Sequence, residues 1–438
     1  MNKAASIALC FGILVTLMAS APMLAIAPDW LAPQLVTLTI AVMLLLLSDA
    51  TAADIQRSVA IFKPLALAAI LPAAWIVMQI VPVPPGSIEN PVWRSAAAAV
   101  PGTASGHLSI DLGFTLRALF RYLGLISLAF TTTVLTRNRD RADTILFAIC
   151  AITTFGAGEL LWSAGLSISN LGRRPADLLD SLVATTAFGA ILNAAFVVRT
   201  MEHYATRPRR QAPSRAYPGM MLFGIFGGII CLIDLICFTS ADTLIAAASG
   251  LMVIGLAVVI RRLGLGRSTL ATVGLATLVA WSGVIALRFA ATPPVSPLLR
   301  FAKAGSIEAD APVLRLIADA TWAGSGVGSY QALAAIHRDS SGAPGDRPIN
   351  TVTSVLLEWG GLGMVAMLVL PLQLVIVLVR GALSRGRDSF YAAAAAACVV
   401  TAVLETYCDT SLGDISVQIL AAISSGLGLA QTTGRHAS

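Results

Sequence analysis

Residues 352–379 read VTSVLLEWGGLGMVAMLVLPLQLVIVLV, and Glu358 is their single charged side chain. A continuous apolar run of this length is typical of a helix that crosses the hydrocarbon core of a bilayer, which takes about 20 residues. The run lacks the alternation of apolar and polar residues that marks a transmembrane β-strand. A helix also satisfies its own backbone hydrogen bonds, as hydrocarbon requires. The stretch therefore predicts a membrane-spanning helix.

The same apolar pattern recurs along the 438 residues, of which 57% are hydrophobic and only 12% charged. Soluble domains carry about 25% charged residues. We predict an all-α bundle of about twelve membrane helices, forming a single transmembrane domain over 1–438. The spans are placed near 6–27, 31–48, 64–81, 114–135, 144–162, 181–198, 218–238, 243–260, 268–288, 352–379, 390–407 and 413–430. The first is interpreted as an uncleaved helix, because a second apolar run follows it almost at once.

Basic residues divide the connecting segments into two sets. One set holds 18 of the 29 Lys and Arg residues, mostly in short loops such as 137–141, 199–215 and 380–387. The positive-inside rule places this set in the cytoplasm, and an even span count puts both termini there. We expect a multi-pass protein of the bacterial inner (cytoplasmic) membrane. The basic residues behind the net charge of +6 are distributed according to membrane side and are not gathered in one surface stripe. No nucleic-acid partner is therefore expected.

Two longer segments, 82–113 and 289–351, lie on the opposite, periplasmic side in this topology. The first is rich in Pro, Gly and Ser, and the second is a large loop that should contain short helices, one of them around 309–322. Loops this long are uncommon in compact proteins and are usually functional. We therefore look for the chemistry in the large loop and at the helix ends beside it.

Arginines gather where these loops meet the spans. Arg117 and Arg121 are four residues apart, so they share one helix face. Arg288 closes another span on the same side, and Arg300 and Arg338 follow in the large loop. Snorkelling to lipid headgroups would explain any one of these residues. Two guanidinium groups on one face also match a diphosphate, so we predict that the set binds an anionic substrate.

The candidate catalytic residues are His337, Arg347 and Glu358. His337 is the single histidine of the large loop, and its ordinary pKa suits base catalysis near neutral pH, although a lone surface histidine can also be incidental. Arg347 is assigned a loop contact, and Glu358 a structural or acceptor-orienting role. The six cysteines lie in or beside apolar runs, and no spacing of His, Cys or carboxylates suggests a metal. We expect no cofactor, no metal and no disulfide.

Two acids lie inside predicted spans. Asp234 and Glu159 each have two interpretations: the acid neutralises an arginine on another helix, or it belongs to a proton relay. A transporter would pair such groups near the midplane of two related halves. The sequence contains no such internal symmetry.

Three stretches carry a family resemblance. The first stretch comprises Trp75, Gln79, Pro82 and Pro84, followed by Ser109, Asp111, Thr115 and Arg117. The second comprises Gly324-Ser-Gly326-Val-Gly328-Ser-Tyr330, followed by Asn350 and Glu358-Trp-Gly360-Gly-Leu-Gly363. The third is Asp414-Ile-Ser-Val-Gln-Ile through Gly426-Leu-Gly428. In this order and placement the chain resembles the O-antigen ligase and polymerase superfamily. These are membrane glycosyltransferases that use undecaprenyl-diphosphate-linked glycans.

The resemblance implies arginines that hold a diphosphate leaving group and a histidine that assists the acceptor hydroxyl. It implies as partners a lipid-linked glycan donor, a glycolipid or glycan acceptor and membrane lipids, and it leaves protein partners unknown. Three places depart from the family pattern: Ile349 occupies the histidine position, 239–242 lacks the family's arginine, and the family's Asn-rich motif is not recognisable in 178–189. We expect glycan transfer in lipopolysaccharide or other surface polysaccharide assembly. A non-catalytic partner of such a system and a membrane transporter or flippase are the alternatives.

Overall fold

The computed structural model describes ten segments of the chain, and all structural statements below concern them. These are residues 3–28, 31–84, 88–99, 106–166, 176–205, 216–263, 316–317, 320–336, 348–384 and 388–432. They are almost entirely helical, and their one β-bridge joins Val83 to Gly106.

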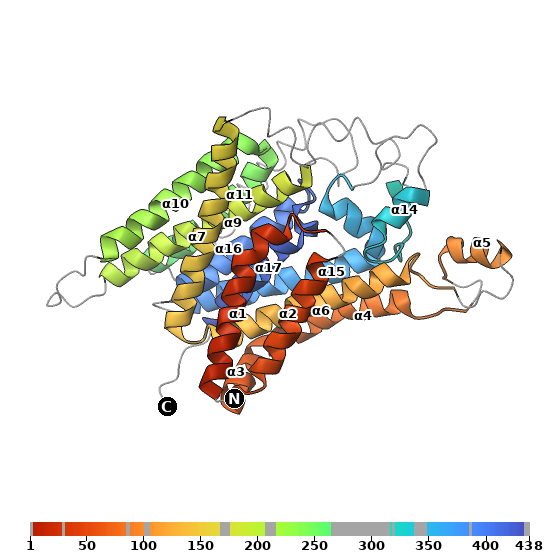
Figure 1. Cartoon of the computed structure of the whole chain (residues 1–438), viewed down its shortest axis with the longest axis horizontal. Helices are drawn as coiled ribbons and strands as arrows, with labels where there is room; N and C mark the ends of the chain where they lie inside the picture. Colours follow the sequence, from red (N-terminus) through yellow and green to blue (C-terminus); the bar gives the residue numbers. More distant parts are fainter. Residues whose placement is uncertain are drawn as a thin grey trace.

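The helices and 3₁₀ turns are, in chain order, α1 Lys3–Leu24, α2 Ala32–Leu47, α3 Ala52–Phe62, η1 Lys63–Leu65, α4 Ala66–Ile80, α5 Pro91–Ala99, α6 Leu112–Leu135, α7 Arg139–Leu166, α9 Ala176–Ala205, α10 Ala216–Phe238, α11 Ala241–Leu263, α14 Tyr330–Ile336, α15 Thr351–Ser384, α16 Ser389–Glu405, η3 Ser411–Gly413 and α17 Ile415–Ala430. The helices run side by side in one bundle, with α5 and α14 at its periphery, away from the start of α1 (Figure 1). The expected all-α architecture is therefore observed in the described segments.

Eight helical stretches in these segments are long and apolar enough to cross a membrane, and three shorter apolar helices, α2, α16 and α17, accompany them. The chain is thus a helical, multi-pass membrane protein. The span predicted at 268–288 and most of the loop 289–351 lie outside the described residues. The count of twelve and the large loop therefore stay predictions.

Several helices extend beyond the predicted spans, α9 for example by five residues at its start and seven at its end, and one boundary differs more. The span expected at 64–81 begins earlier, because helix runs from Ala52 to Ile80 with only the short turn η1 inside it. Pro64 lies in that turn, where its missing N–H interrupts the α-helical hydrogen bonds without ending the helical path. Upstream, Thr51 caps α3 by accepting a hydrogen bond from Asp54 N.

Helices α9, α16 and α17 form the interior of the bundle, and α10 lies on its outer side (Figure 1). The run Ala392–Ala397 of α16 is entirely buried. Such small side chains let helix backbones approach closely, which is how helices in lipid gain packing contacts. At Gly428 of α17, an added methyl group would overlap the Ala395 side chain, so α16 and α17 are in close contact there.

Arginines at one end of the bundle pair with acids on neighbouring helices. Arg137 contacts Asp54 at 2.6 Å, Arg139 contacts Asp388 at 2.8 Å and Arg261 contacts Glu202 at 2.6 Å, and Arg199 binds Asp143, which also accepts from the Tyr391 hydroxyl. These contacts join α3 to the end of α6, α7 to α9, and α9 to α11. Charges at this end, which we call the basic end, therefore hold the helices together.

Candidate functional site

The opposite end brings together residues that are far apart in sequence. Gln79, fully buried at the end of α4, donates from Nε2 to the carbonyl oxygens of Ala323 and Glu358, both at 3.0 Å. Its Oε1 accepts a hydrogen bond from Val327 N at 3.1 Å. One amide side chain thus fixes the end of α4 against the 320–329 segment and the start of α15.

The Glu358 carboxylate holds the same segment from the other side. Its Oε2 accepts from Gly328 N at 2.9 Å and its Oε1 accepts from Tyr330 N at 3.1 Å. The side chain is buried, and the positive charge of Arg121 is close enough to act on it. Since both oxygens bind backbone N–H groups, these contacts favour the structural role for Glu358 over the acceptor-orienting one.

Two glycines allow this close approach of backbones. Gly360, inside α15, has φ +71° and ψ 175°, a conformation that is essentially restricted to glycine, and Gly324 has φ +76°. A methyl group at Gly360 would overlap Trp322 O and Gly324 N, and one at Gly324 would overlap Glu358 O. The two glycine backbones therefore pack directly against each other.

The segment before α6 completes the arrangement. Ser109 N donates to Gln79 O at 3.1 Å, and Ser109 Oγ lies 2.7 Å from Thr115 Oγ1. Ile110 N donates to Ser325 O at 2.8 Å, and Trp75 Nε1 donates to Trp359 O at 2.8 Å. We call this set the motif junction, defined as Trp75, Gln79, 109–115, 323–330 and 357–363.

The motif junction gives a first prediction. Gln79→Leu keeps the approximate size of the side chain but removes three buried hydrogen bonds. An unpaired buried polar group costs about 1–3 kcal/mol. We expect a clear fall in the apparent melting temperature of the detergent-solubilised protein. Gln34→Leu, at an exposed position of α2, is the matched control; equal melting of both variants and the wild type would contradict the described packing.

The two arginines of α6 have different surroundings. Arg121 Nε donates to Gln418 Oε1 at 2.8 Å, and an Nη donates to Gly413 O at 2.5 Å, which binds α6 to the start of α17. Arg117 is exposed, and its guanidinium carbon lies 5.3 Å from the centre of the Phe114 ring. Arg121 is thus held by the protein, whereas Arg117 faces the surroundings one turn nearer the motif junction.

Five predicted site residues lie outside the described segments, so their roles stay predictions. They are Arg288, Arg300, His337, Arg338 and Arg347. Of the predicted site residues, the structure describes Arg117, Arg121 and Glu358. The positive charge of Arg121 acts on the Glu358 carboxylate, and that carboxylate accepts hydrogen bonds from backbone N–H groups of the motif junction.

The turn between α16 and η3, which the sequence interpretation did not single out, binds the start of α15. Ile349 is buried, and the next residue, Asn350, donates from Nδ2 to Tyr407 O at 2.9 Å. Thr351 N donates to Asp409 O at 2.9 Å. The start of α15 is thus bound to the turn that follows α16, which carries Asp409. No sequence signal singles out this turn, because an acid at the end of an apolar span is an ordinary feature.

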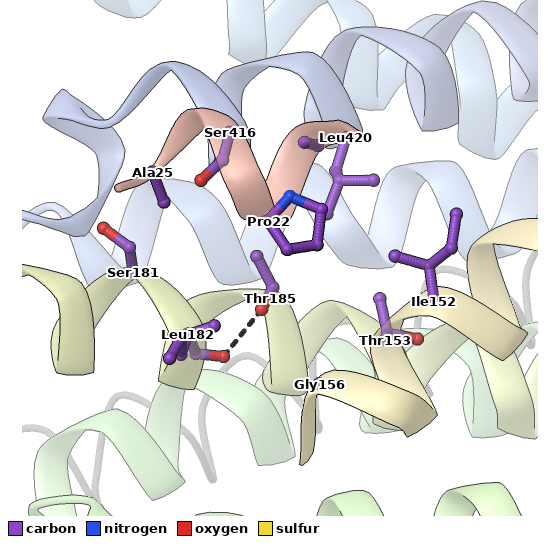
Figure 2. Close-up of a pocket in the computed structure, with 11 residues that line it drawn as sticks. Pro22, Ala25, Ile152, Thr153, Gly156, Ser181, Leu182, Thr185, Ser416 and Leu420 are labelled. Atoms are coloured by element: carbon purple, nitrogen blue, oxygen red, sulfur yellow. Dashed lines mark hydrogen bonds between the residues drawn. The ribbon is translucent and has the colours of Figure 1, made fainter. Parts of the chain in front are cut away.

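A small cavity lies between α1, α7, α9 and α17 (Figure 2). Its volume of about 20 Å³ is enough for a water molecule. Its polar lining includes Ser181 and Ser416, which hold Asp414: Ser181 Oγ donates to Oδ2 at 2.8 Å and Ser416 N donates to Oδ1 at 2.7 Å. None of Arg117, Arg121 and Glu358 lines it, and a space of this size cannot hold a glycan donor.

The interior acid Asp234 on α10 is fully buried, beside Thr186 of α9. Neither carboxylate oxygen has a hydrogen-bond partner among the described residues. The interpretation in which an arginine neutralises Asp234 therefore finds no such contact in this part of the chain.

No family model matches the sequence, and a search among curated proteins found no match. Within the described segments, no three His, Cys, Asp or Glu residues are grouped so that they could hold a metal ion. The functional argument therefore rests on the membrane fold, the motif junction and the charges beside it.

Proposed function

We propose that this protein transfers a polyprenyl-diphosphate-linked glycan to an acceptor hydroxyl at the outer face of the bacterial inner membrane. The step would belong to lipopolysaccharide or other surface polysaccharide assembly and be of the O-antigen ligase kind. One observation carries the proposal: two motif stretches that resemble that family, separated by more than two hundred residues, are hydrogen-bonded together in the motif junction. Arg117 and Arg121 follow directly on the helix that begins there.

The chemistry needs a positive site for the leaving group. The acceptor oxygen attacks the anomeric carbon, the bond from that carbon to the diphosphate oxygen breaks, and the lipid diphosphate leaves with the electron pair. Guanidinium groups stabilise the developing charge, because they form charge-assisted, bidentate bonds to phosphate oxygens. Arg117 would contact the diphosphate directly. Arg121 would shape the site from its fixed position between α6 and α17.

The remaining predicted residues keep their proposed roles in this mechanism. Arg288, Arg300 and Arg338 would extend the phosphate-binding set, and Arg347 would contact substrate from the large loop. His337 is the sequence-based candidate for the proton acceptor. The buried contacts of Glu358 support a role in holding the 323–330 segment, which would form one wall of the site.

A transporter is the second candidate function, and the buried Asp234 carboxyl, which forms no ion pair in the described segments, favours it. An ionisable group inside a membrane span is costly and often marks a proton or ion pathway. The two functions differ in where a lipid-linked glycan would collect when the gene is removed. Loss of a transferase leaves the donor in the outer leaflet, whereas loss of a flippase leaves it in the cytoplasmic leaflet.

A deletion strain tests this difference. We expect it to lose surface polysaccharide and to accumulate lipid-linked glycan in the outer leaflet, where a periplasmic glycosidase added to spheroplasts degrades it. Wild-type protein supplied from a plasmid should restore the polysaccharide. Accumulation that resists the glycosidase until the membrane is permeabilised would support the flippase, and an unchanged strain would count against both.

Orientation is a separate prediction within this proposal. The positive-inside rule puts the basic end in the cytoplasm and the motif junction outside. Exposed Ser95 on α5 and exposed Ser384 at the end of α15 are suitable positions on the two sides. In a background without the six native cysteines, an impermeant thiol reagent should label Ser95→Cys but not Ser384→Cys in intact spheroplasts. The reverse pattern would invert the topology.

A further inference from the structure

A pair of acids at the end of α16 is not explained by the packing of the bundle. Glu405 is fully buried, and neither of its carboxylate oxygens has a hydrogen-bond partner among the described residues. Asp409, one turn further along, is also buried and is close enough for its charge to act on Glu405. Asp409 Oδ1 accepts a hydrogen bond from Ser411 N at 3.0 Å, which fixes its side chain in the turn.

The acids at the basic end show what structural carboxylates look like in this protein. Asp143, Asp388 and Glu202 each contact an arginine of a neighbouring helix. No such ion pair to Glu405 exists in the segments that the structure describes, and a buried charge without a partner costs several kcal/mol. Two carboxyls side by side reduce that cost by sharing one proton. The pair is therefore suited to taking up and releasing a proton.

The pair lies between the start of α15 and the arginine helix α6, both of which the proposed reaction would use. On one side, the start of α15 binds the same turn, through Asn350 Nδ2 to Tyr407 O at 2.9 Å and Thr351 N to Asp409 O at 2.9 Å. On the other side, η3 follows the turn directly, and its Gly413 O accepts from Arg121 at 2.5 Å. The carboxyls are thus in the segment that connects Ile349 with the arginine helix α6.

We infer that Asp409 is the proton acceptor of the transfer reaction and that Glu405 is the second member of its carboxyl pair. This assignment rests on the proposed function. As the acceptor oxygen bonds to the anomeric carbon and the diphosphate leaves with the electron pair of the broken bond, the hydroxyl proton passes to the Asp409 carboxylate. Glu405 keeps the proton that the pair already holds, so the pair carries one proton before the step and two after it. The assignment competes with His337 and explains how a chain with Ile349 in place of a histidine would still carry out the transfer.

The test uses purified full-length protein in lipid nanodiscs, with a labelled undecaprenyl-diphosphate glycan and a lipid A–core acceptor. Asp409→Asn should lower the transfer rate by about 10²–10⁴-fold, the contribution of a general base, while donor binding stays near the wild-type value. Asp409→Glu should restore part of the rate. Wild-type transfer should fall toward low pH, and the residual activity of Asp409→Asn should lack this dependence. Asp180→Asn, at the same end of the bundle, is the matched control.

The possible results of this test distinguish a failure of the Asp409 assignment from a failure of the proposed function. If the wild type transfers glycan and Asp409→Asn matches it while His337→Ala loses the rate, the assignment is wrong and the function stands. If the wild type transfers nothing, both are wrong. A readout without activity covers the case in which Asp409→Asn fails to fold: dicyclohexylcarbodiimide modifies protonated carboxyls in apolar surroundings, and should modify Glu405 of the wild-type protein. An unmodified Glu405 would contradict the shared proton.

Discussion

Gly360→Ala is expected to disrupt the motif junction and to lower the apparent melting temperature more than any other single change considered above. The backbone conformation at Gly360, φ +71° and ψ 175°, costs a residue with a side chain on the order of 1–3 kcal/mol. The added methyl group would also overlap Trp322 O and Gly324 N, which are backbone atoms and cannot rotate away. The variant should therefore melt well below the wild type, and its yield after membrane extraction should fall.

Gly361→Ala supplies the control for this experiment. It lies next to Gly360 in the same helix, has no left-handed backbone angle, and an added methyl group there meets no atom within 4 Å. It should melt like the wild type. Equal behaviour of the two alanine variants at the same heating rate would show that the backbones of α15 and the 320–329 segment do not make the contact described.

The second large effect concerns donor binding by Arg117. A hydrogen bond to a charged group contributes about 1.5–3 kcal/mol, so its loss weakens binding tenfold to more than a hundredfold. Arg117→Gln should raise the Kd for the labelled lipid-diphosphate donor by such a factor and leave melting nearly unchanged, because this side chain is exposed. Raised ionic strength should weaken wild-type binding in the same direction.

Arg94→Gln is the matched control for loss of one positive charge at this end. Arg94 is exposed on α5 and lies 3.8 Å from Glu89. Its Kd for the donor should stay within about twofold of the wild type. If Arg117→Gln and Arg94→Gln bind the donor equally well, the diphosphate site is not at Arg117.

The membrane helices could be predicted because their signal is local and strong. Long apolar runs have one stable solution in lipid, so runs such as 218–238 and 243–260 correspond closely to α10 and α11. The start of the 64–81 span was wrong for a local reason as well. Pro64, at which the predicted span starts, lies in a 3₁₀ turn within a continuous helical stretch.

The contacts of the candidate site could be predicted only in part. The sequence interpretation named Gln79, Gly324 and Glu358 as members of two motif stretches, but their hydrogen bonds depend on packing between segments far apart in the chain. The same holds for Arg121: sequence spacing pairs it with Arg117, but its side chain donates hydrogen bonds to Gln418 of α17 and to Gly413 of η3. Such pairings cannot be read from helical periodicity.

The acid pair of α16 was missed for a different reason. Glu405 sits at the end of the predicted span 390–407, where a charged residue is ordinary because it can reach the interface. Only the three-dimensional arrangement shows that its side chain is fully buried and without a hydrogen-bond partner in the described segments. A single sequence does not report burial. Burial is what distinguishes an acid inside the bundle, such as Glu405, from one that reaches the membrane interface.

Transfer by the purified wild-type protein tests the central claim most directly. Nanodiscs containing the protein, a labelled undecaprenyl-diphosphate glycan and a lipid A–core or glycan acceptor should yield glycosylated acceptor and free undecaprenyl diphosphate in equal amounts. Arg117→Gln should shift this reaction to higher donor concentrations. Wild-type protein that binds the donor but transfers it to neither acceptor would contradict the account and favour a non-catalytic partner of a polysaccharide assembly system.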